Sequence, residues 1–482
     1  MSYLEFNMPM SSTCLIAYAL HADTKRVLAL GQGDWSLYIM RLFRLRLVKV
    51  LSEMPDPVIH HIEMCVFDAQ DTLNRLKKFG FNLFAKRQTA SCQQLVARLG
   101  TVFYLITERS LHYKPNSISK NVGDETVRTE SFTTLCCEES PAHEVDTVFN
   151  LAFSVKKGDV IDISERICTH GGQIIQAPTE ITEEKNGTVF FSIVKSNCCG
   201  NIVHTLINTD DYNGEFLPGF EIVNQCEFSN DLKICGIDHC TLACYSGNSG
   251  KVVSFYEECF GMNRFQITSN DDENNGLIIS DGVGLRLRAM EYWRCAETGL
   301  SYKNKNENSF LLVVVESLQG QTNCNVEEFL RHHKEGIEHI ALRSQSIVET
   351  VSKLKNNAVD FRNPPRAYYD ELRNNLKISR LGLDLDLLSQ FGILLDNEDD
   401  SADESGGSPE KKYLMQIFAK PLFDLKTFFI EIIQRSGARG LGSGNILALV
   451  RSIREEERRN MMKSEAKTQE ITKESFTSPR HC

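Results

Sequence analysis

GIDHCTLAC at residues 236–244 and GIEHIALRS at residues 336–344 are two copies of one strand-like pattern, each with a histidine in fourth place. VIHHIEMCV at residues 58–66 and TVFNLAFSV at residues 147–155 share the same apolar opening. Aligned at positions 59, 148, 237 and 337, the four segments recur after 89, 89 and 100 residues. Four similar openings at near-equal spacing indicate an internal repeat.

Each opening begins a module in which a helix precedes three strands. Apolar residues three or four positions apart predict helices after the first and last openings; these residues are Leu73, Leu76, Phe79, Ile347, Val351 and Leu354. Short β-rich segments follow, such as TVFYLI at residues 101–106. The pattern predicts an α+β fold of four β-α-β-β-β modules. Because one module cannot bury its sheet face alone, the modules should pair into two open-barrel domains.

The domain boundaries follow from the repeats and from changes in composition. A leader at residues 1–56 precedes a first domain at residues 57–225 and a second at residues 230–455. Residues 396–412 (DNEDDSADESGGSPEKK) are acidic and nearly free of apolar side chains, so we expect a disordered insert there. The charged tail at residues 456–482 should be solvated.

Charge and hydropathy exclude two classes of partner. A net charge of −11 provides no electrostatic footprint for nucleic acid, and no apolar run reaches the roughly 18 to 20 residues of a membrane span. Residues 36–51 are apolar, Arg-rich and free of acids, which is typical of a transit peptide. We therefore expect a mitochondrial protein, with the cytoplasm as the alternative, and leave open whether it forms a homodimer.

Two histidines and one glutamate form a candidate metal site. His239 and His339 occupy the same place on two equivalent strands, and Glu431 lies in the final predicted strand, TFFIEIIQR at residues 427–435. A lone carboxylate buried among these apolar residues costs several kcal/mol unless a cation or hydrogen-bond donors meet it. Two imidazoles and one carboxylate are the facial triad typical of non-heme Fe(II) oxygenases.

The first domain lacks this combination. His61 occupies the aligned position of the first module, but Asn150 stands where a second imidazole would be needed. A single histidine on a strand is more often a structural residue than a ligand. We therefore interpret His61 as structural and predict that the first domain binds no metal.

The chain resembles the 4-hydroxyphenylpyruvate dioxygenase family. The matching segments are GIDHCTLAC, FYEECFGM, GIEHIALRS, PPRAYYDELR, GILLDNE, YLMQIFAKPLFD, TFFIEIIQR and GLGSGNILAL, and FLPGF at residues 216–220 extends the match into the first domain. The resemblance implies the vicinal-oxygen-chelate fold and one Fe(II) per chain, held by His239, His339 and Glu431. It implies no catalytic residue beyond these ligands.

The resemblance also implies a reaction and a substrate pocket. The substrate would be a small 2-oxo acid that binds the iron directly, with O2 as co-substrate and CO2 as a product. The residues that match the family's pocket are Gln416, Phe418, Leu441, Asn445 and Ile446. Residues 441–454 match a C-terminal helix that closes the site.

Several departures from the family pattern affect the expected substrate and product. The strand SFLLVVVES at residues 309–317 has no serine at the position where the family has one, and the loop after it is shorter than the family's Pro-Ile-Asn-Glu-Pro type loop. Glu327 stands in place of a glutamine. Leu441 and Ile446 replace two phenylalanines of the family's FGxGNF motif. In hydroxymandelate synthases, which share the fold, a smaller aliphatic residue occupies the second of these places.

These features lead to one hypothesis and two alternatives. The hypothesis is an Fe(II) dioxygenase that converts an aryl pyruvate, 4-hydroxyphenylpyruvate, into 4-hydroxymandelate and CO2. The first alternative is a 4-hydroxyphenylpyruvate dioxygenase that forms homogentisate. The second belongs to another class, a vicinal-oxygen-chelate protein that binds a metal or ligand without turnover.

Overall fold

The computed structural model describes residues 58–88, 92–108, 145–223, 231–268, 271–272, 274–280, 282–291, 310–321, 323–398, 411–425 and 428–446. The leader, the charged tail and most of the expected insert lie outside these ranges. Within them, no helix is long and apolar enough to cross a membrane.

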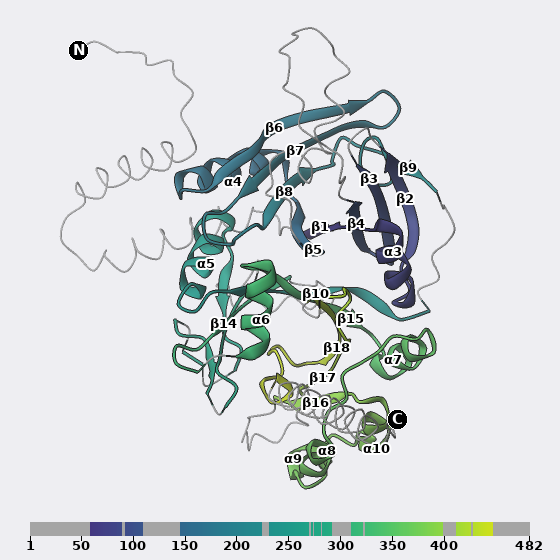
Figure 1. The fold of residues 1–482 in the computed structure, drawn as a ribbon, viewed down its shortest axis with the longest axis vertical. Helices are drawn as coiled ribbons and strands as arrows, with labels where there is room; N and C mark the ends of the chain where they lie inside the picture. The colour runs from purple at the N-terminus through teal and green to yellow at the C-terminus, as the bar shows by residue number, and fades with distance from the viewer. Residues whose placement is uncertain are drawn as a thin grey trace, which may run out of the picture. The chain divides into compact units, whose positions relative to one another are not determined.

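The first nine-stranded sheet contains the first two modules (Figure 1). Module one consists of β1 (Val58–Val66), α3 (Ala69–Lys78), β2 (Asn82–Gln88), β3 (Gln93–Leu99) and β4 (Val102–Glu108). Module two consists of β5 (Thr147–Ser154), α4 (Lys157–Thr169), β6 (Gln173–Glu183), β7 (Gly187–Lys195) and β8 (Val203–Asn208), and β9 (Glu221–Ile222) follows it. The strand order is β6-β7-β8-β5-β1-β4-β3-β2-β9.

The second nine-stranded sheet contains modules three and four. Module three consists of β10 (Ile234–Cys244), α5 (Ser249–Phe255), the π-helical turn η3 (Tyr256–Phe260), β11 (Asn263–Phe265), β12 (Leu277–Ile279), β13 (Leu285–Glu291) and β14 (Leu311–Ser317). After α6 (Cys324–His333), module four consists of β15 (Gly336–Ser344), α7 (Ile347–Asn356), β16 (Leu394–Asn397), β17 (Tyr413–Phe418) and β18 (Phe429–Ser436). The order is β11-β13-β14-β10-β15-β18-β17-β16, with β12 beside β13.

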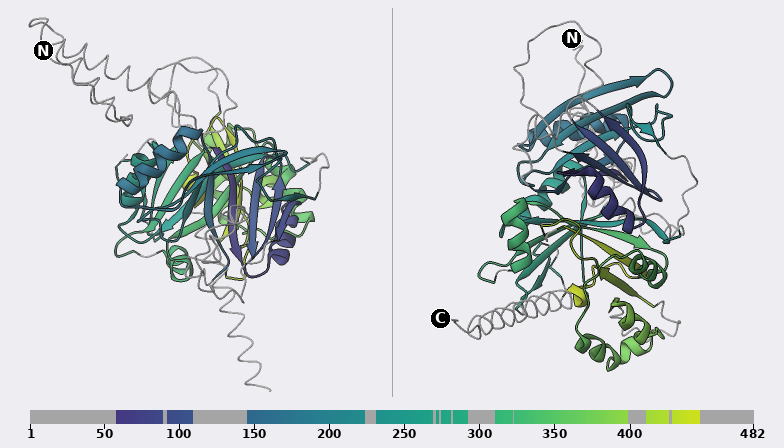
Figure 2. Two further views of the ribbon diagram at one scale, coloured as in Figure 1. Left: turned by 90° about the horizontal axis from the view of Figure 1, so that it is seen from above. Right: turned by 45° about the vertical axis from the view of Figure 1, so that its right-hand side comes forward.

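The four modules share one pairing rule, which confirms the predicted repeat. The first strand of each module runs parallel to the last strand of the same module, as in β1–β4, β5–β8, β10–β14 and β15–β18. The two first strands of each sheet then pair antiparallel, as β1–β5 and β10–β15. Each sheet therefore joins two modules along its centre and curls into an open barrel (Figures 1 and 2).

Module four contains three helices that the repeat does not predict. They are α8 (Arg366–Arg373), α9 (Leu376–Ser379) and α10 (Leu385–Phe391), and they lie between α7 and β16. The Tyr368 hydroxyl of α8 accepts from the backbone N–H of Leu395 at 2.7 Å, which fixes this helix against β16.

Alternation along the strands divides the core into layers. Residues that face the module helices form one continuous apolar cluster with members from both sheets, including Leu73 of α3 and Val351 of α7. The opposite, concave face of each sheet has its own cluster, which contains Phe191 in the first sheet and Val313 in the second. The polar residues described below interrupt these concave faces.

Strands β16 and β17 form an antiparallel hairpin that includes residues at both ends of the expected insert. β16 continues through Asn397, and the Glu398 N–H donates to the Lys412 carbonyl at 2.9 Å. The boundaries 396 and 412 are therefore too wide, because backbone pairing with β17 orders residues that have little apolar surface to bury. Residues 399–410 lie outside the described ranges.

We predict that residues 400–409 can be replaced by two glycines. The flanks already pair, and the free-energy cost of loop closure changes slowly with loop length, so the free energy of unfolding should change by less than about 0.5 kcal/mol. Urea denaturation measures this. Replacing residues 396–412 in the same way removes paired backbone and should destabilise the protein clearly; equal effects of the two deletions would contradict this prediction.

Candidate metal centre

The strand register brings His239, His339 and Glu431 onto one face of the second sheet. His239 on β10 pairs with Ala341 on β15, which in turn pairs with Glu431 on β18. His339 lies two residues before Ala341, between Thr241 and Phe429 in the next row. Side chains of directly paired residues point to the same face, so the three predicted residues surround the small side chain of Ala341.

The three side chains converge as the sequence predicts. One ligand atom from each lies within 4.8 Å of the other two. An oxygen of Glu431 lies 3.6 Å from Nε2 of His239 and 3.6 Å from Nε2 of His339. Metal–ligand bonds of about 2.0 to 2.2 Å can bridge such separations with small adjustments.

A β-bulge precedes each histidine and presents an acid to it. The β10–β15 register skips Asp238 between the pairs at Ile237 and His239, and skips Glu338 between those at Ile337 and His339. Asp238 Oδ1 then lies 3.0 Å from His239 Nδ1, and Glu338 Oε2 lies 3.2 Å from His339 Nδ1. When Nδ1 donates to a carboxylate, Nε2 keeps its lone pair for a metal. Bulges commonly redirect side chains beside functional sites in this way.

Two arginines form ion pairs with Asp238. Arg435 donates to both of its carboxylate oxygens at 2.9 and 2.8 Å, and Arg343 donates at 2.9 Å. Burial opposes ionisation of Asp238, but Arg435 and His239 hold the pKa of its carboxyl well below its usual range. Asp238 therefore stays an anion that orients the His239 ring.

The charges around His239 favour a cation. Burial alone would lower the pKa of His239, yet Glu431 and Asp238 raise the pKa of this imidazole to about 9. Glu431 is only 1% exposed and lies on a face that is otherwise largely apolar. The electrostatic environment of the site therefore stabilises a positive charge. Two imidazole Nε2 atoms and one carboxylate are also a donor set that suits a divalent metal.

A chain of buried amides orients Glu431. Gln416 on β17 donates to Glu431 Oε1 at 2.8 Å, and Asn445 donates to the Gln416 carbonyl oxygen at 2.9 Å. Tyr368 of α8 in turn donates to Asn445 at 2.9 Å. The predicted pocket residues Gln416 and Asn445 thus hold the carboxylate and connect it to the segment at residues 441–446.

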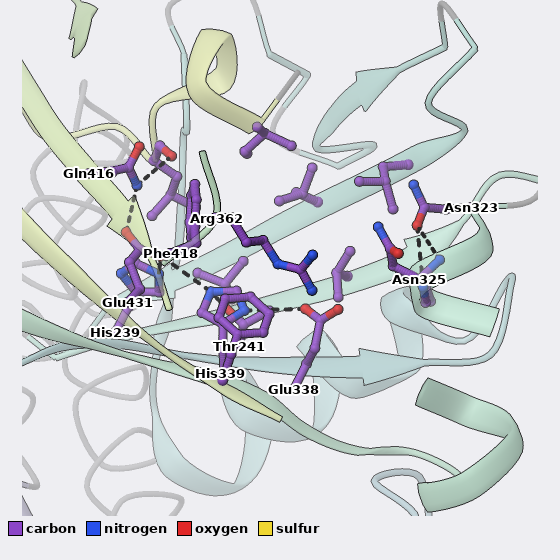
Figure 3. A pocket seen from close by; sticks show the side chains of 18 of the residues that line it. His239, Thr241, Asn323, Asn325, Glu338, His339, Arg362, Gln416, Phe418 and Glu431 are labelled. Carbon is purple, nitrogen blue, oxygen red and sulfur yellow. Dashed lines mark hydrogen bonds and ion pairs between the residues drawn. The ribbon is translucent and has the colours of Figure 1, made fainter. Parts of the chain in front are cut away.

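A pocket opens over the three residues (Figure 3). Among the predicted residues, Gln416, Phe418, Leu441 and Ile446 line it, whereas Asn445 is fully buried behind Gln416. Aliphatic residues from β13 and β14 complete one wall: Leu285, Leu287, Val313 and Val315. Phe429 stacks on the His339 ring, with centroids 4.6 Å apart. Residues 447–454 of the expected closing helix lie outside the described ranges.

Sequence reasoning missed several polar residues of the site. Asp238 and Glu338 come directly before the two histidines, but strict strand alternation would place them on the other face. Thr241, whose hydroxyl lies 2.9 Å from His339 Nε2, and Arg362 also line the pocket. The repeated acid-His pair was the one sequence signal that could have revealed the bulges.

The first sheet has the same strand register as the second, but different side chains occupy the positions of the candidate ligands. His61 pairs with Ala152 as His239 pairs with Ala341, and Asn150 takes the place of His339. Thr205, two residues after the Val203 that pairs with Asn150, takes the place of Glu431. Asn150 donates to Glu63 at 2.9 Å and to Thr205 at 2.8 Å. This closed network supports the interpretation of His61 as structural.

Comparisons with known proteins identify relatives of the chain. No protein-family model matches the chain. The 4-hydroxyphenylpyruvate dioxygenase-like protein of Rattus norvegicus is 30% identical over 403 residues, 82% of this chain and 96% of that protein. The human protein of the same name is 30% identical over 407 residues, 83% of this chain and 97% of that protein. The 4-hydroxyphenylpyruvate dioxygenase of Neurospora crassa is 32% identical over 330 residues, 67% of this chain and 72% of that enzyme.

Solved structures show the same fold. A mutant of 4-hydroxymandelate synthase from Streptomyces coelicolor aligns with a TM-score of 0.61 and 23% identity, over 84% of this chain and all of that one. A fusion of a xylose isomerase-like barrel with 4-hydroxyphenylpyruvate dioxygenase aligns with a TM-score of 0.52 and 16% identity, over 83% of this chain and 53% of that one. The architecture is the predicted vicinal-oxygen-chelate fold.

We predict that Ala341→Leu abolishes metal binding although all three ligands remain. The larger side chain would fill the space between His239 and Glu431, so the metal content should fall from one equivalent per chain to near zero. Elemental analysis after anaerobic Fe(II) loading measures this.

Ala152→Leu is the matched control at the equivalent position of the first sheet. Both alanines are fully buried, so each variant should lose about 1 to 3 kcal/mol of stability through overpacking, but Ala152→Leu should keep its metal. A full equivalent of metal in Ala341→Leu would show that the register account is wrong.

Proposed function

The chain belongs to the family of 4-hydroxyphenylpyruvate dioxygenases and their dioxygenase-like relatives, and from this premise we propose that it is an Fe(II)-dependent dioxygenase. Its substrate is an aryl pyruvate, 4-hydroxyphenylpyruvate, and its products are 4-hydroxymandelate and CO2. Both oxygen atoms of O2 enter 4-hydroxymandelate, one in its carboxylate and one in its new hydroxyl group, and the carboxylate of the substrate leaves as CO2, so the reaction balances without a second 2-oxo acid.

The chain's own residues supply the positioning for this reaction. His239, His339 and Glu431 would hold Fe(II), which supplies the place where a 2-oxo acid chelates and O2 is reduced. Asp238 and Glu338 fix the two imidazole rings, and Gln416 fixes the carboxylate. Because these groups are largely buried and preorganised, they need little rearrangement when the metal and substrate bind.

The observation that carries the proposed product is the aliphatic wall of the pocket. Leu441 and Ile446 line it together with aliphatic residues of β13 and β14. A phenylalanine in place of Ile446 would stack on the substrate ring and press it toward the metal. The shorter aliphatic wall would leave the ring room to retreat and would present the benzylic carbon, in place of a ring carbon, for hydroxylation. A barrier difference of about 1.4 kcal/mol already gives a tenfold product ratio.

Homogentisate formation remains the alternative within the same family, since the Neurospora crassa relative bears the name of that dioxygenase. The two reactions share the metal ligands and differ only in the carbon that is hydroxylated. The shape of the pocket wall therefore distinguishes them better than the metal centre does.

The proposal predicts the product of one simple incubation. Protein loaded anaerobically with Fe(II) and then given 4-hydroxyphenylpyruvate and O2 should form 4-hydroxymandelate, identified by chromatography and mass. Glu431→Ala, treated identically, should form none. Homogentisate alone would contradict the proposed product, and no turnover of any aryl pyruvate would contradict the proposed function.

Ile446→Phe should shift the product toward homogentisate or other ring-oxidised products. The added ring restores the flat wall, and a change of about tenfold in product ratio needs only about 1.4 kcal/mol. Ile446→Val, which keeps an aliphatic wall, is the matched control and should leave the ratio nearly unchanged. An unaltered ratio in Ile446→Phe, at unchanged metal content, would show that this wall does not select the product.

A further inference from the structure

Arg362 lies at a rigid point beside the pocket. The backbone of Phe361 bridges to Ala419, and the Arg362 N–H donates to the Phe418 carbonyl at 2.9 Å. The sequence Asn363-Pro364-Pro365 then leads directly into α8. Proline fixes its own backbone and restricts the preceding residue, here Asn363. Together with the bridge and the hydrogen bond on the other side, this limits the positions that the Arg362 Cα can take.

The side chain of Arg362 extends into the pocket that contains the metal ligands. Among the described residues that line this pocket, it is the only lysine or arginine. In Figure 3 its guanidinium extends toward the part of the pocket where Glu338 projects. Glu338 uses one carboxylate oxygen for His339 Nδ1, which leaves the other oxygen to accept a further hydrogen bond. The pocket therefore combines a fixed donor and a fixed acceptor.

This combination fits one kind of substituent better than another. A phenolic hydroxyl both accepts and donates, so it can accept from a guanidinium and donate to a carboxylate. A second carboxylate on the substrate would be repelled by Glu338 and by Glu328, which also lines the pocket. An unsubstituted ring can form neither of these two hydrogen bonds, so it should bind less tightly than a hydroxylated ring.

The side-chain amides at the start of α6 are weaker candidates for binding a ring hydroxyl. Asn323 is the helix cap: its side-chain oxygen accepts from the Asn325 and Val326 N–H groups, and its amide nitrogen donates to Val283. Both its amide oxygen and its amide nitrogen thus already have partners. Asn325 also lines the pocket and is the competing candidate in the experiment below.

We propose that Arg362, together with Glu338, recognises the ring hydroxyl of a 4-hydroxyaryl 2-oxo acid and so determines specificity. This inference rests on the proposed function. Arg362 is a specificity residue here and takes no part in the bond changes.

Anaerobic titration separates this role from turnover. Fe(II)-loaded protein is titrated without O2 against 4-hydroxyphenylpyruvate and against phenylpyruvate, and the absorption of the 2-oxo acid chelate reports binding. The wild-type protein should bind the hydroxylated ligand at least tenfold more tightly, since a hydrogen bond to a charged group contributes about tenfold to a hundredfold in affinity. Arg362→Leu should bind phenylpyruvate as the wild-type protein does and lose the preference.

Three further variants act as controls. Arg366→Leu removes a nearby exposed arginine that does not line the pocket, and it should keep both affinities. Arg362→Lys retains the charge without the two-pronged donor and should keep part of the preference. Asn325→Ala should keep it in full. Thermal unfolding and metal content establish that each variant is folded and loaded.

The outcomes distinguish this inference from the proposed function. If neither 2-oxo acid binds to the wild-type protein, the proposed function is wrong and this inference falls with it. If both bind with equal affinity, the function stands and the role of Arg362 is wrong. Equal weakening of both ligands in Arg362→Leu, or loss of the preference in Asn325→Ala alone, would also overturn it.

Discussion

The buried carboxylate of Glu431 is the constraint on which the second sheet depends. Its side chain is 1% exposed, and the strand around it consists of large apolar residues. An isolated ion in such a place costs several kcal/mol, so the fold must provide donors and positive charge. Gln416 provides a hydrogen bond at 2.8 Å, and the two imidazoles lie within reach of a shared cation. Metal binding and the stability of this half of the protein should therefore be linked.

The metal site and the fold are nevertheless separable. Both sheets use the same register and place an alanine at the centre, but only the second has two histidines and a glutamate around it. In the first sheet, Asn150 bonds to Glu63 and Thr205, so side-chain hydrogen bonds satisfy the polar groups there. Burial raises the pKa of Glu63, although hydrogen bonds from Asn150 and Thr107 and the nearby charge of Arg87 act in the opposite direction. The same fold thus accommodates either a cluster of candidate metal ligands or a network of side-chain hydrogen bonds.

The sequence predicts the repeat and the ligands well because both depend on periodic patterns. Four equivalent apolar openings indicate the four modules, and two equivalent histidines indicate two of the three side chains that the structure brings together. The helices α8, α9 and α10 interrupt the repeat in module four, so the pattern could not predict them. Asp238 and Glu338 escaped detection because a bulge, which depends on pairing between strands, places them on the unexpected face. Arg362 escaped because a residue between a β-bridge and two prolines follows no periodic pattern.

The most direct test of the central claim is anaerobic equilibrium dialysis against Fe(II), combined with thermal unfolding of the same samples. The structure predicts one equivalent per chain and a midpoint that rises with free Fe(II), as expected for a ligand bound only by the folded state. In a variant with His239, His339 and Glu431 all replaced by alanine, both effects should disappear. Equal binding by that variant and the wild-type protein, or no rise in the wild-type midpoint at saturation, would contradict the account.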